Sequence, residues 1–289
     1  MLECVVNVSE GRDDVVVAAI AAAGDDAVLD VHSDADHNRS VLTLAGPDVE
    51  DAVRAVARVA VERIDLGRHA GVHPRLGALD VVPFVPCDGD GHPLGAGADL
   101  APAMVARDRF AAWAGAALAL PCFLYGPERT LPDVRRDAFH RLAPDAGPWE
   151  PHPSAGACAV GARPALVAYN LWLEERAGLS TARALARAVR GPAVRALGLA
   201  VGGTAQVSCN LVDPLRTGPS EVFDAVSRLA ADAGTTVVRA ELVGLAPAAV
   251  VDAVAPDRRA LLDLDPGRTV EARLARRPAS PLRPVDGPG

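Results

Sequence analysis

LECVVNV (residues 2–8), followed by DDVVVAAIAAA (residues 13–23), sets the fold class of this 289-residue chain. β-branched residues dominate the first stretch and predict a strand, whereas the second has acidic residues in its first turn and the apolar spacing of a helix. A strand, a loop and a helix in this order begin an α/β fold. Asn7 lies at the strand-to-helix junction, where a polar group can orient a ligand or cap the helix.

The same alternation continues along the chain. Further strands are predicted at residues 27–31, 40–45, 79–85, 121–125, 165–173, 196–200, 206–211 and 236–243, and helices at 49–64, 100–118, 181–190 and 220–233. Between the two halves, residues 144–156 are too rich in proline and glycine for a helix or a central strand and predict a rigid loop.

Asparagine recurs in three apolar strands, as Asn7, Asn170 and Asn210, which suggests two related lobes. We therefore expect an α/β protein of the α+β sandwich type, with two similar subdomains whose mixed sheets are flanked by helices. The expected boundaries are 1–163 and 164–276, and the proline-rich residues 277–289 are expected to be a disordered tail.

The composition of the chain limits the classes of ligand and cofactor that it is expected to bind. The formal charge is -8 and no dense basic stripe is present, so nucleic acid is not an expected partner. The chain contains no lysine, which excludes Schiff-base and P-loop lysine chemistry and leaves arginine to hold anions. We find no GxGxxG, P-loop or GxSxG pattern, so nucleotide cofactors and serine hydrolysis lack their usual signals.

The five cysteines indicate a reducing compartment because they are odd in number, far apart and mostly within apolar stretches. The N-terminus lacks the basic flank and the apolar run of a signal peptide, and charged residues interrupt each candidate membrane span. We expect a cytoplasmic protein.

RHAGVHPRLGALD (residues 68–80) is the segment richest in candidate chemistry, directly before a predicted strand. His73 can accept and return protons near neutral pH, and Pro74 restricts the backbone beside it. Arg68 and Arg75 can bind carboxylates. The alternative is a solvated loop with a capping histidine. A zinc site of His69 and His73 is disfavoured because glycine and proline oppose a helix there and the peptidase glutamate is missing.

HSDADHNR (residues 32–39) offers enough ligands for a metal in His32, Asp34, Asp36 and His37. Asp and Asn in a connection usually form turns, so turn chemistry is the default interpretation and a metal-dependent hydrolase the outside alternative.

Several stretches together resemble the formiminotransferase domain of glutamate formimidoyltransferase, the folate enzyme of histidine degradation. ECVVNVSEGR (residues 3–12) is similar to the family's opening, and residues 64–80 are similar to its most specific motif, which contains HPR. Shorter similarities follow in the same order at residues 123–126, 129–132, 161–163, 205–211 and 241–245.

This resemblance implies a ligand groove between the two subdomains, in which a formimidoyl group passes from N-formimino-L-glutamate to N5 of tetrahydrofolate, the co-substrate. It implies that His73 is the general acid-base and that no metal is needed. The implied substrate-binding residues are Asn7, His32, Asp34, Asn38, Arg39, Arg68 and Arg75. The implied folate-contacting residues are Gly147, Pro148, Trp149, Glu150, Pro151, His152, Pro153, Ser154, Ala155 and Gly156. The family also implies a homodimer, without nucleic-acid or membrane partners.

The chain departs from the family pattern at four positions. Val6 and Val8 replace a proline and a phenylalanine, and Val72 replaces a glutamate. His32 stands where the family has an aspartate that assists the catalytic histidine, so either Asp34 or Asp36 orients His73 instead, or His32 does different chemistry. These changes leave two alternatives open, a related folate-dependent transferase with a different donor and a catalytically silent folate-binding module.

Overall fold

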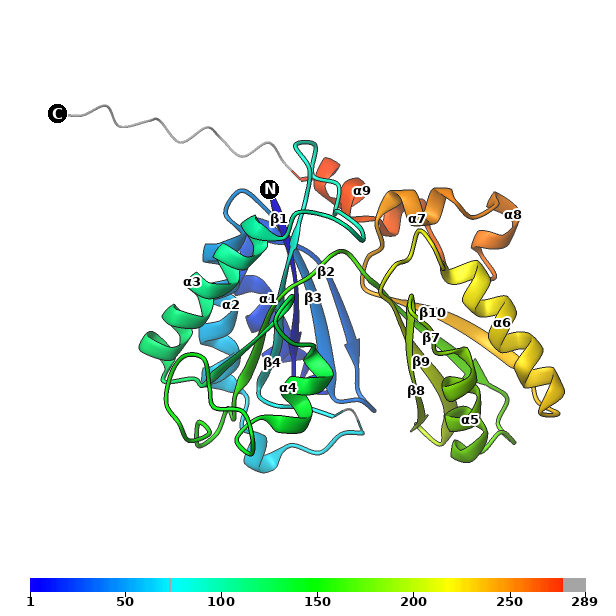
Figure 1. Cartoon of the computed structure of the whole chain (residues 1–289), viewed down its shortest axis with the longest axis horizontal. Helices are drawn as coiled ribbons and strands as arrows, with labels where there is room; N and C mark the ends of the chain where they lie inside the picture. The colour runs from blue at the N-terminus through cyan, green and yellow to red at the C-terminus, as the bar shows by residue number, and fades with distance from the viewer. Residues whose placement is uncertain (73, 278–289) are drawn as a thin grey trace.

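The computed structural model describes residues 1–72 and 74–277, which form two lobes, each built on a β-sheet whose long helices cover one face (Figure 1). The first lobe contains β1 (Leu2–Val8), α1 (Asp14–Ala23), β2 (Val28–Asp34), β3 (Arg39–Gly46), α2 (Val49–Arg63), β4 (Leu79–Pro86), α3 (Ala101–Leu118), β5 (Cys122–Tyr125), α4 (Leu131–Asp137) and β6 (Cys158–Ala162). The second contains β7 (Val167–Leu173), α5 (Leu179–Val189), β8 (Val194–Val201), β9 (Thr204–Leu211), α6 (Pro219–Asp232) and β10 (Val237–Val243), followed by α7 (Ala248–Asp252), α8 (Pro256–Arg259) and α9 (Val270–Ala275).

The two sheets share one topology. The first has the strand order β2-β3-β1-β4-β6-β5 and the second β10-β7-β9-β8. In each lobe a strand, a helix, two strands, a helix and a strand follow one another, and the first strand lies antiparallel between the third and the fourth. This is the split βαβ arrangement of ferredoxin-like folds. In the first lobe β6 adds to it in parallel with β4 and β5.

The expectation of two α/β subdomains is thus confirmed, with one mixed and one antiparallel sheet. By topology β1 corresponds to β7, so Asn170 is the counterpart of Asn7. Asn210, which the sequence pattern also grouped with Asn7, lies on β9, the counterpart of β3. Asn7 and Asn210 therefore occupy strands that do not correspond.

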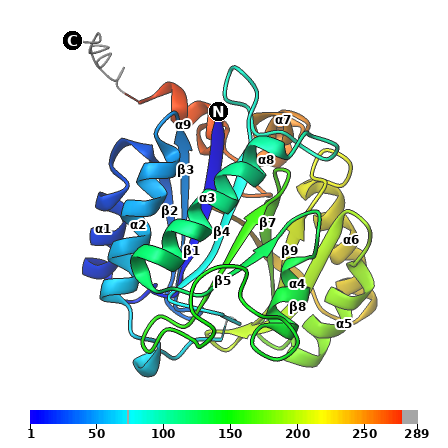
Figure 2. The ribbon, with the colours of Figure 1, turned by 60° about the vertical axis from the view of Figure 1, so that its left-hand side comes forward.

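Alternation along the strands gives each sheet a core face and an inner face. On β1, Cys4, Val6 and Val8 are fully buried in the core under the helices, so Glu3, Val5 and Asn7 point the other way. On β7, Tyr169 and Leu171 are fully buried in the second core. α1, α2 and α3 cover the outer face of the first sheet, and α5 and α6 that of the second (Figure 2). The short helix α4 packs on the inner face of the first sheet, where Val134 contacts the cluster of Val81 and Tyr125. The inner faces of the two sheets are directed at each other.

The last helix joins the lobes. Val270 of α9 packs with Leu29 and Ala45 of the first lobe and with Leu245, just after β10. Arg277 donates a hydrogen bond to the carbonyl of Ala45 at 2.7 Å, so the first residue of the expected tail is fixed to the first lobe, while residues 278–289 lie outside the described residues. No helix in the described part of the chain is long and apolar enough to span a bilayer.

Candidate functional site

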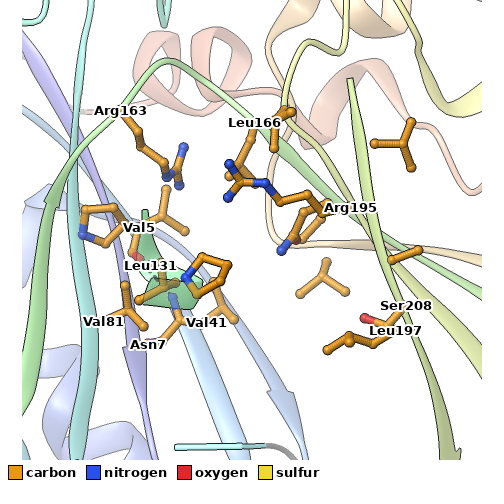
Figure 3. Close-up of a pocket in the computed structure, with 18 of the residues that line it drawn as sticks. Val5, Asn7, Val41, Val81, Leu131, Arg163, Leu166, Arg195, Leu197 and Ser208 are labelled. Carbon is orange, nitrogen blue, oxygen red and sulfur yellow. Dashed lines mark hydrogen bonds between the residues drawn. The ribbon is translucent and has the colours of Figure 1, made fainter. Parts of the chain in front are cut away.

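A cavity of about 820 Å³ separates the inner faces of the two sheets (Figure 3). Val5, Asn7 and Val81 line it from the first lobe, and Asn170 and Ser208 from the second. The period-two alternation that builds the cores therefore also builds this cavity, because the residues between the core positions face it. A chamber of this size, mostly apolar with a few polar groups, is suited to a small organic ligand.

Arginine dominates the charge of the cavity. Among the described residues, its lining contains one acidic residue, Glu3, and six arginines: Arg39, Arg135, Arg136, Arg163, Arg190 and Arg195. Burial lowers the pKa of Arg39 to about 10, so this guanidinium stays charged at neutral pH. Burial raises the pKa of Glu3 to about 7, although Arg163 acts against this. The cavity therefore favours an anionic ligand.

Three loops of the first lobe meet beside the Asn7 end of the cavity. Asn38, which has a φ of +49°, accepts a hydrogen bond from the Gly11 amide at 3.0 Å and donates one to the carbonyl of Ala70 at 3.1 Å. Its side chain thus ties the loop after β1 to the β2–β3 turn and to the segment before β4. Gly11 has no room for a side chain, because a Cβ would lie 2.4 Å from the carbonyl oxygen of Asp34.

The segment around position 73 is held on both sides. The Val72 amide donates to the carbonyl of Asp36 at 3.4 Å, and Arg135 donates to the carbonyl of Pro74 at 2.9 Å. Pro74 itself lines the cavity. His73 lies outside the described residues.

Asp80 anchors this segment from within β4. It is 1% exposed, and its carboxylate accepts hydrogen bonds from the Leu76 amide at 2.5 Å and from Arg135 at 2.6 Å. Because Arg135 also binds Pro74, one buried ion pair fixes both ends of the turn that enters β4.

His32 takes part in a contact between the lobes. Its Nε2 lies 3.7 Å from Oε1 of Glu241, which joins the edge strands β2 and β10. Glu241 also accepts hydrogen bonds from Trp172 at 2.9 Å and from Asn170 at 3.2 Å. Burial lowers the pKa of His32, while Glu241 acts in the opposite direction.

Five of the seven predicted substrate-binding residues fall into three groups, and the other two, His32 and Asp34, are not among the residues that line the cavity. Asn7 and Arg39 line the cavity. Asn38 and Arg75 lie in the loop cluster, where Arg75 contacts Nε2 of His69 at 2.6 Å and donates to the carbonyl of Gly71. Arg68 has a side chain that is 90% exposed and lies near Asp65, so the structure does not bring it to the cavity.

The β2–β3 loop has the turn chemistry expected of it. Oδ1 of Asp34 accepts hydrogen bonds from the backbone amides of Asp36 and His37 at 2.9 and 2.8 Å. No group of three or more His, Cys, Asp or Glu side chains in residues 1–72 and 74–277 has the arrangement of a metal site.

The loop at residues 147–156 does not line the cavity. Trp149 is 78% exposed, and Gly147 backs onto Gly115 of α3. The far end of the loop braces the segment that enters β4, because the Ala155 carbonyl accepts the Ala78 amide at 2.9 Å. The restricted backbone of its prolines suits this bracing position.

The structure also draws attention to four residues that no sequence motif assigned to the site: Arg163, Arg195, Asp80 and Glu241. Arg163 and Arg195 reach into the cavity from opposite walls (Figure 3). The position of Arg195 between the apolar residues Val194 and Ala196 of β8 was the available signal, but a charged residue at such a position is also typical of a solvated strand face.

Comparisons with known proteins agree with this architecture. The family described as the N-terminal subdomain of the formiminotransferase domain matches residues 1–163, and the family described as the formiminotransferase domain matches residues 177–256.

Individual relatives cover the same span. A glutamate formimidoyltransferase of Streptococcus pyogenes is 33% identical over 87% of this chain and 91% of its own length, and one of Thermoplasma acidophilum is 32% identical over 95% and 97%. A formimidoyltransferase-cyclodeaminase of Sus scrofa is 34% identical over 88% of this chain, which spans only 52% of that longer protein.

Proposed function

This chain belongs to the formiminotransferase family, and from that premise we propose that it transfers the formimidoyl group of N-formimino-L-glutamate to N5 of tetrahydrofolate in the cavity between its lobes. Similarity to glutamate formimidoyltransferases over nearly their whole length supports this activity. The cavity itself is the observation that supports this location for the reaction. Its apolar walls and its arginine charges suit folate, which is flat and anionic.

The reaction needs one group that moves protons. N5 of tetrahydrofolate attacks the formimino carbon, a tetrahedral intermediate forms, and the bond from that carbon to the glutamate nitrogen breaks. A proton leaves N5, and the glutamate nitrogen gains one. A single imidazole can accept the first proton and donate the second.

His73 is our proposal for that group. Its chain neighbours support it, because Pro74 lines the cavity and Val72 hydrogen-bonds to the loop that follows β2. Asp80 and Arg135 fix the turn beyond it, which favours one position for a side chain in this segment. Asn7 and Arg39, on the same side of the cavity, would contact the substrates.

The test replaces His73 by alanine. We expect kcat for formimidoyl transfer to fall by roughly 10²- to 10⁴-fold, the usual contribution of a general acid-base, with tetrahydrofolate affinity in calorimetry nearly unchanged. His140→Ala, an exposed histidine away from the cavity, is the matched control. Full activity of His73→Ala would disprove the assignment, and a wild-type protein that binds tetrahydrofolate without turnover would disprove the donor.

His32 favours a second candidate, transfer from a different amidine or formyl donor. It stands where the family has a carboxylate, and its Nε2 lies 3.7 Å from Glu241 of the other lobe, so the carboxylate nearest to this position comes from a different strand. Turnover with another donor, at a higher kcat/KM than with formiminoglutamate, would decide for this candidate.

A further inference from the structure

One end of the cavity has two arginines that form no ion pair in the described part of the chain. Arg163 follows β6 and Arg195 lies on β8, and their guanidinium groups reach toward each other from the two lobes (Figure 3). In the described ranges, neither residue forms an ion pair, whereas Arg135 is paired with Asp80 and Arg136 with Asp133.

Glu3 offsets only part of the charge at this end. It is 5% exposed and faces Arg163, but its raised pKa leaves a large share of its carboxyl groups protonated near neutral pH. The Arg163 side chain is instead held by a hydrogen bond to the carbonyl of Pro164 at 3.0 Å. Guanidinium groups bind carboxylates in bidentate geometry, so two of them at one end of the cavity suit a ligand carboxylate.

The strand pairings place these arginines at the end of the cavity opposite Pro74. The Arg163 amide donates to the carbonyl of Phe84, whose partner on β1 is Cys4, next to Glu3. Arg195 pairs with Asn210, which pairs with Ala168 at the start of β7.

The distance between the two ends of the cavity can be estimated along β1. Asn7 marks the Pro74 end and Glu3 the Arg163 end, and the four residue steps from one to the other (7 − 3) span about 13 Å at ~3.3 Å per residue. In tetrahydrofolate, the p-aminobenzoyl spacer separates N5 from the carboxylates of the glutamate tail by a comparable length. A folate whose N5 reacts beside Pro74 therefore brings its tail to Arg163 and Arg195.

We propose that Arg163 and Arg195 form a carboxylate clamp, one arginine from each lobe, that binds the glutamate tail of tetrahydrofolate. This proposal rests on the proposed function. Because the tail would be held by both lobes at once, binding of the co-substrate would also fix the lobes relative to each other.

The experiment compares two acceptors that differ only in the tail. Steady-state kinetics are measured with tetrahydrofolate and with tetrahydropteroate, which lacks the glutamate, for the wild type, Arg163→Gln and Arg195→Gln. Arg187→Gln, on the outer face of α5 and outside the cavity lining, is the matched control. Arg195 is exposed, so its variant is expected to fold, and thermal unfolding checks both.

We expect each cavity variant to raise KM for tetrahydrofolate by roughly 10-fold or more, the usual worth of a charged hydrogen bond, with kcat and KM for formiminoglutamate nearly unchanged. KM for tetrahydropteroate should be the same in all four proteins. An unchanged KM for tetrahydrofolate, or an equal rise with both acceptors, would overturn the clamp, and so would a rise confined to formiminoglutamate.

Failure of the proposed function gives a different result, namely no formimidoyl transfer by the wild type. In that case calorimetric affinities for folates with and without the tail still test the clamp. Loss of the tail-dependent affinity difference in Arg195→Gln would support it, and persistence of the difference would refute it.

Discussion

The two lobes follow the same path of strands and helices but differ in their connections. In the first lobe the connection from α2 to β4 runs from residue 64 to 78, whereas the corresponding connection from α6 to β10 covers only residues 233–236. The β2–β3 turn carries Asn38, while the β8–β9 turn consists of Gly202 and Gly203. The shared topology therefore supplies two similar walls, and the longer loops of the first lobe supply the candidate chemistry. Changes in those loops should affect folding and catalysis, and matched changes in the second lobe should not.

Asp80→Ala should have the largest effect on stability. It removes the buried partner of Arg135 and of the Leu76 amide, and breaking a buried ion pair costs roughly 3–5 kcal/mol. Val238 occupies the same second position of β10 and is 61% exposed, so Val238→Ala should change the free energy of unfolding by at most about 0.5 kcal/mol. Urea denaturation of both variants measures the difference. Similar small losses would show that the ion pair does not hold the α2–β4 connection.

Glu3→Gln should stabilise the protein at alkaline pH. When β1 is aligned with β7 so that Asn7 matches Asn170, Glu3 matches Leu166 (7 − 3 = 170 − 166). The second lobe therefore has no titrating group at this position. Burial raises the pKa of Glu3 from 4.5 to about 7, with Arg163 opposing and Glu271 adding to the shift. A folded-state pKa above the unfolded one means that stability present below pH 4.5 is lost as the pH rises through about 7. That loss amounts to about 3 kcal/mol.

The variant lacks this titration, so it should exceed the wild type by about 3 kcal/mol at pH 8 and by progressively less towards pH 5. Urea denaturation across this pH range measures the difference. Glu62→Gln, exposed on α2, is the control and should give no such pH-dependent gain. A Glu3→Gln gain that is equal at pH 5 and pH 8 would mean that the carboxyl does not titrate between them.

The contrast between the lobes also explains how much the sequence could predict. The strand at 2–8 and the helix that follows it were predicted from their residues, because local spacing determines both. β6, with the sequence CAVGA, was not predicted because it is short and its side chains are small. Packing requires the glycine in it, since the Tyr125 ring lies where a Cβ of Gly161 would be. Arg163 and Arg195 were missed because the meeting of two sheets is a tertiary property that no local pattern contains.

Gly11→Ala and Gly203→Ala compare a packed glycine of the first lobe with an open one of the second. A Cβ at Gly11 would collide with the backbone of Asp34 and Arg39, and overpacking of this kind costs roughly 1–3 kcal/mol. Gly203 has a φ of +82° with nothing within 4 Å of a Cβ, so alanine there costs about 1 kcal/mol of backbone strain alone.

Activity should separate these two variants more clearly than stability does. Gly11→Ala disturbs the hydrogen bond to Asn38 and with it the loop cluster, so we expect kcat to fall roughly 10-fold, whereas Gly203→Ala should keep wild-type kcat. Thermal unfolding and steady-state kinetics on the same preparations give both quantities. A fall in kcat for Gly203→Ala would show that the β8–β9 turn takes part in the reaction.

Trp149→Ala should have the smallest effect on stability and activity. It tests whether every long loop of the first lobe takes part in the reaction. Trp149 is 78% exposed in a loop that does not line the cavity, so we expect a change in unfolding free energy within about 0.5 kcal/mol and an unchanged KM for tetrahydrofolate.

His152→Ala is the matched change in the same loop, because Nδ1 of His152 accepts a hydrogen bond from the Ala155 amide at 3.1 Å and so fixes the end of the loop that braces the segment before β4. We expect it to lower kcat by roughly 2- to 5-fold through displacement of the segment that follows His73. A KM for tetrahydrofolate that rises in Trp149→Ala would instead favour direct folate contact by residues 147–156, as the family resemblance implies. The functional part of the first lobe would then extend beyond the cavity edge, and the contrast with the second lobe would be larger than the cavity alone suggests.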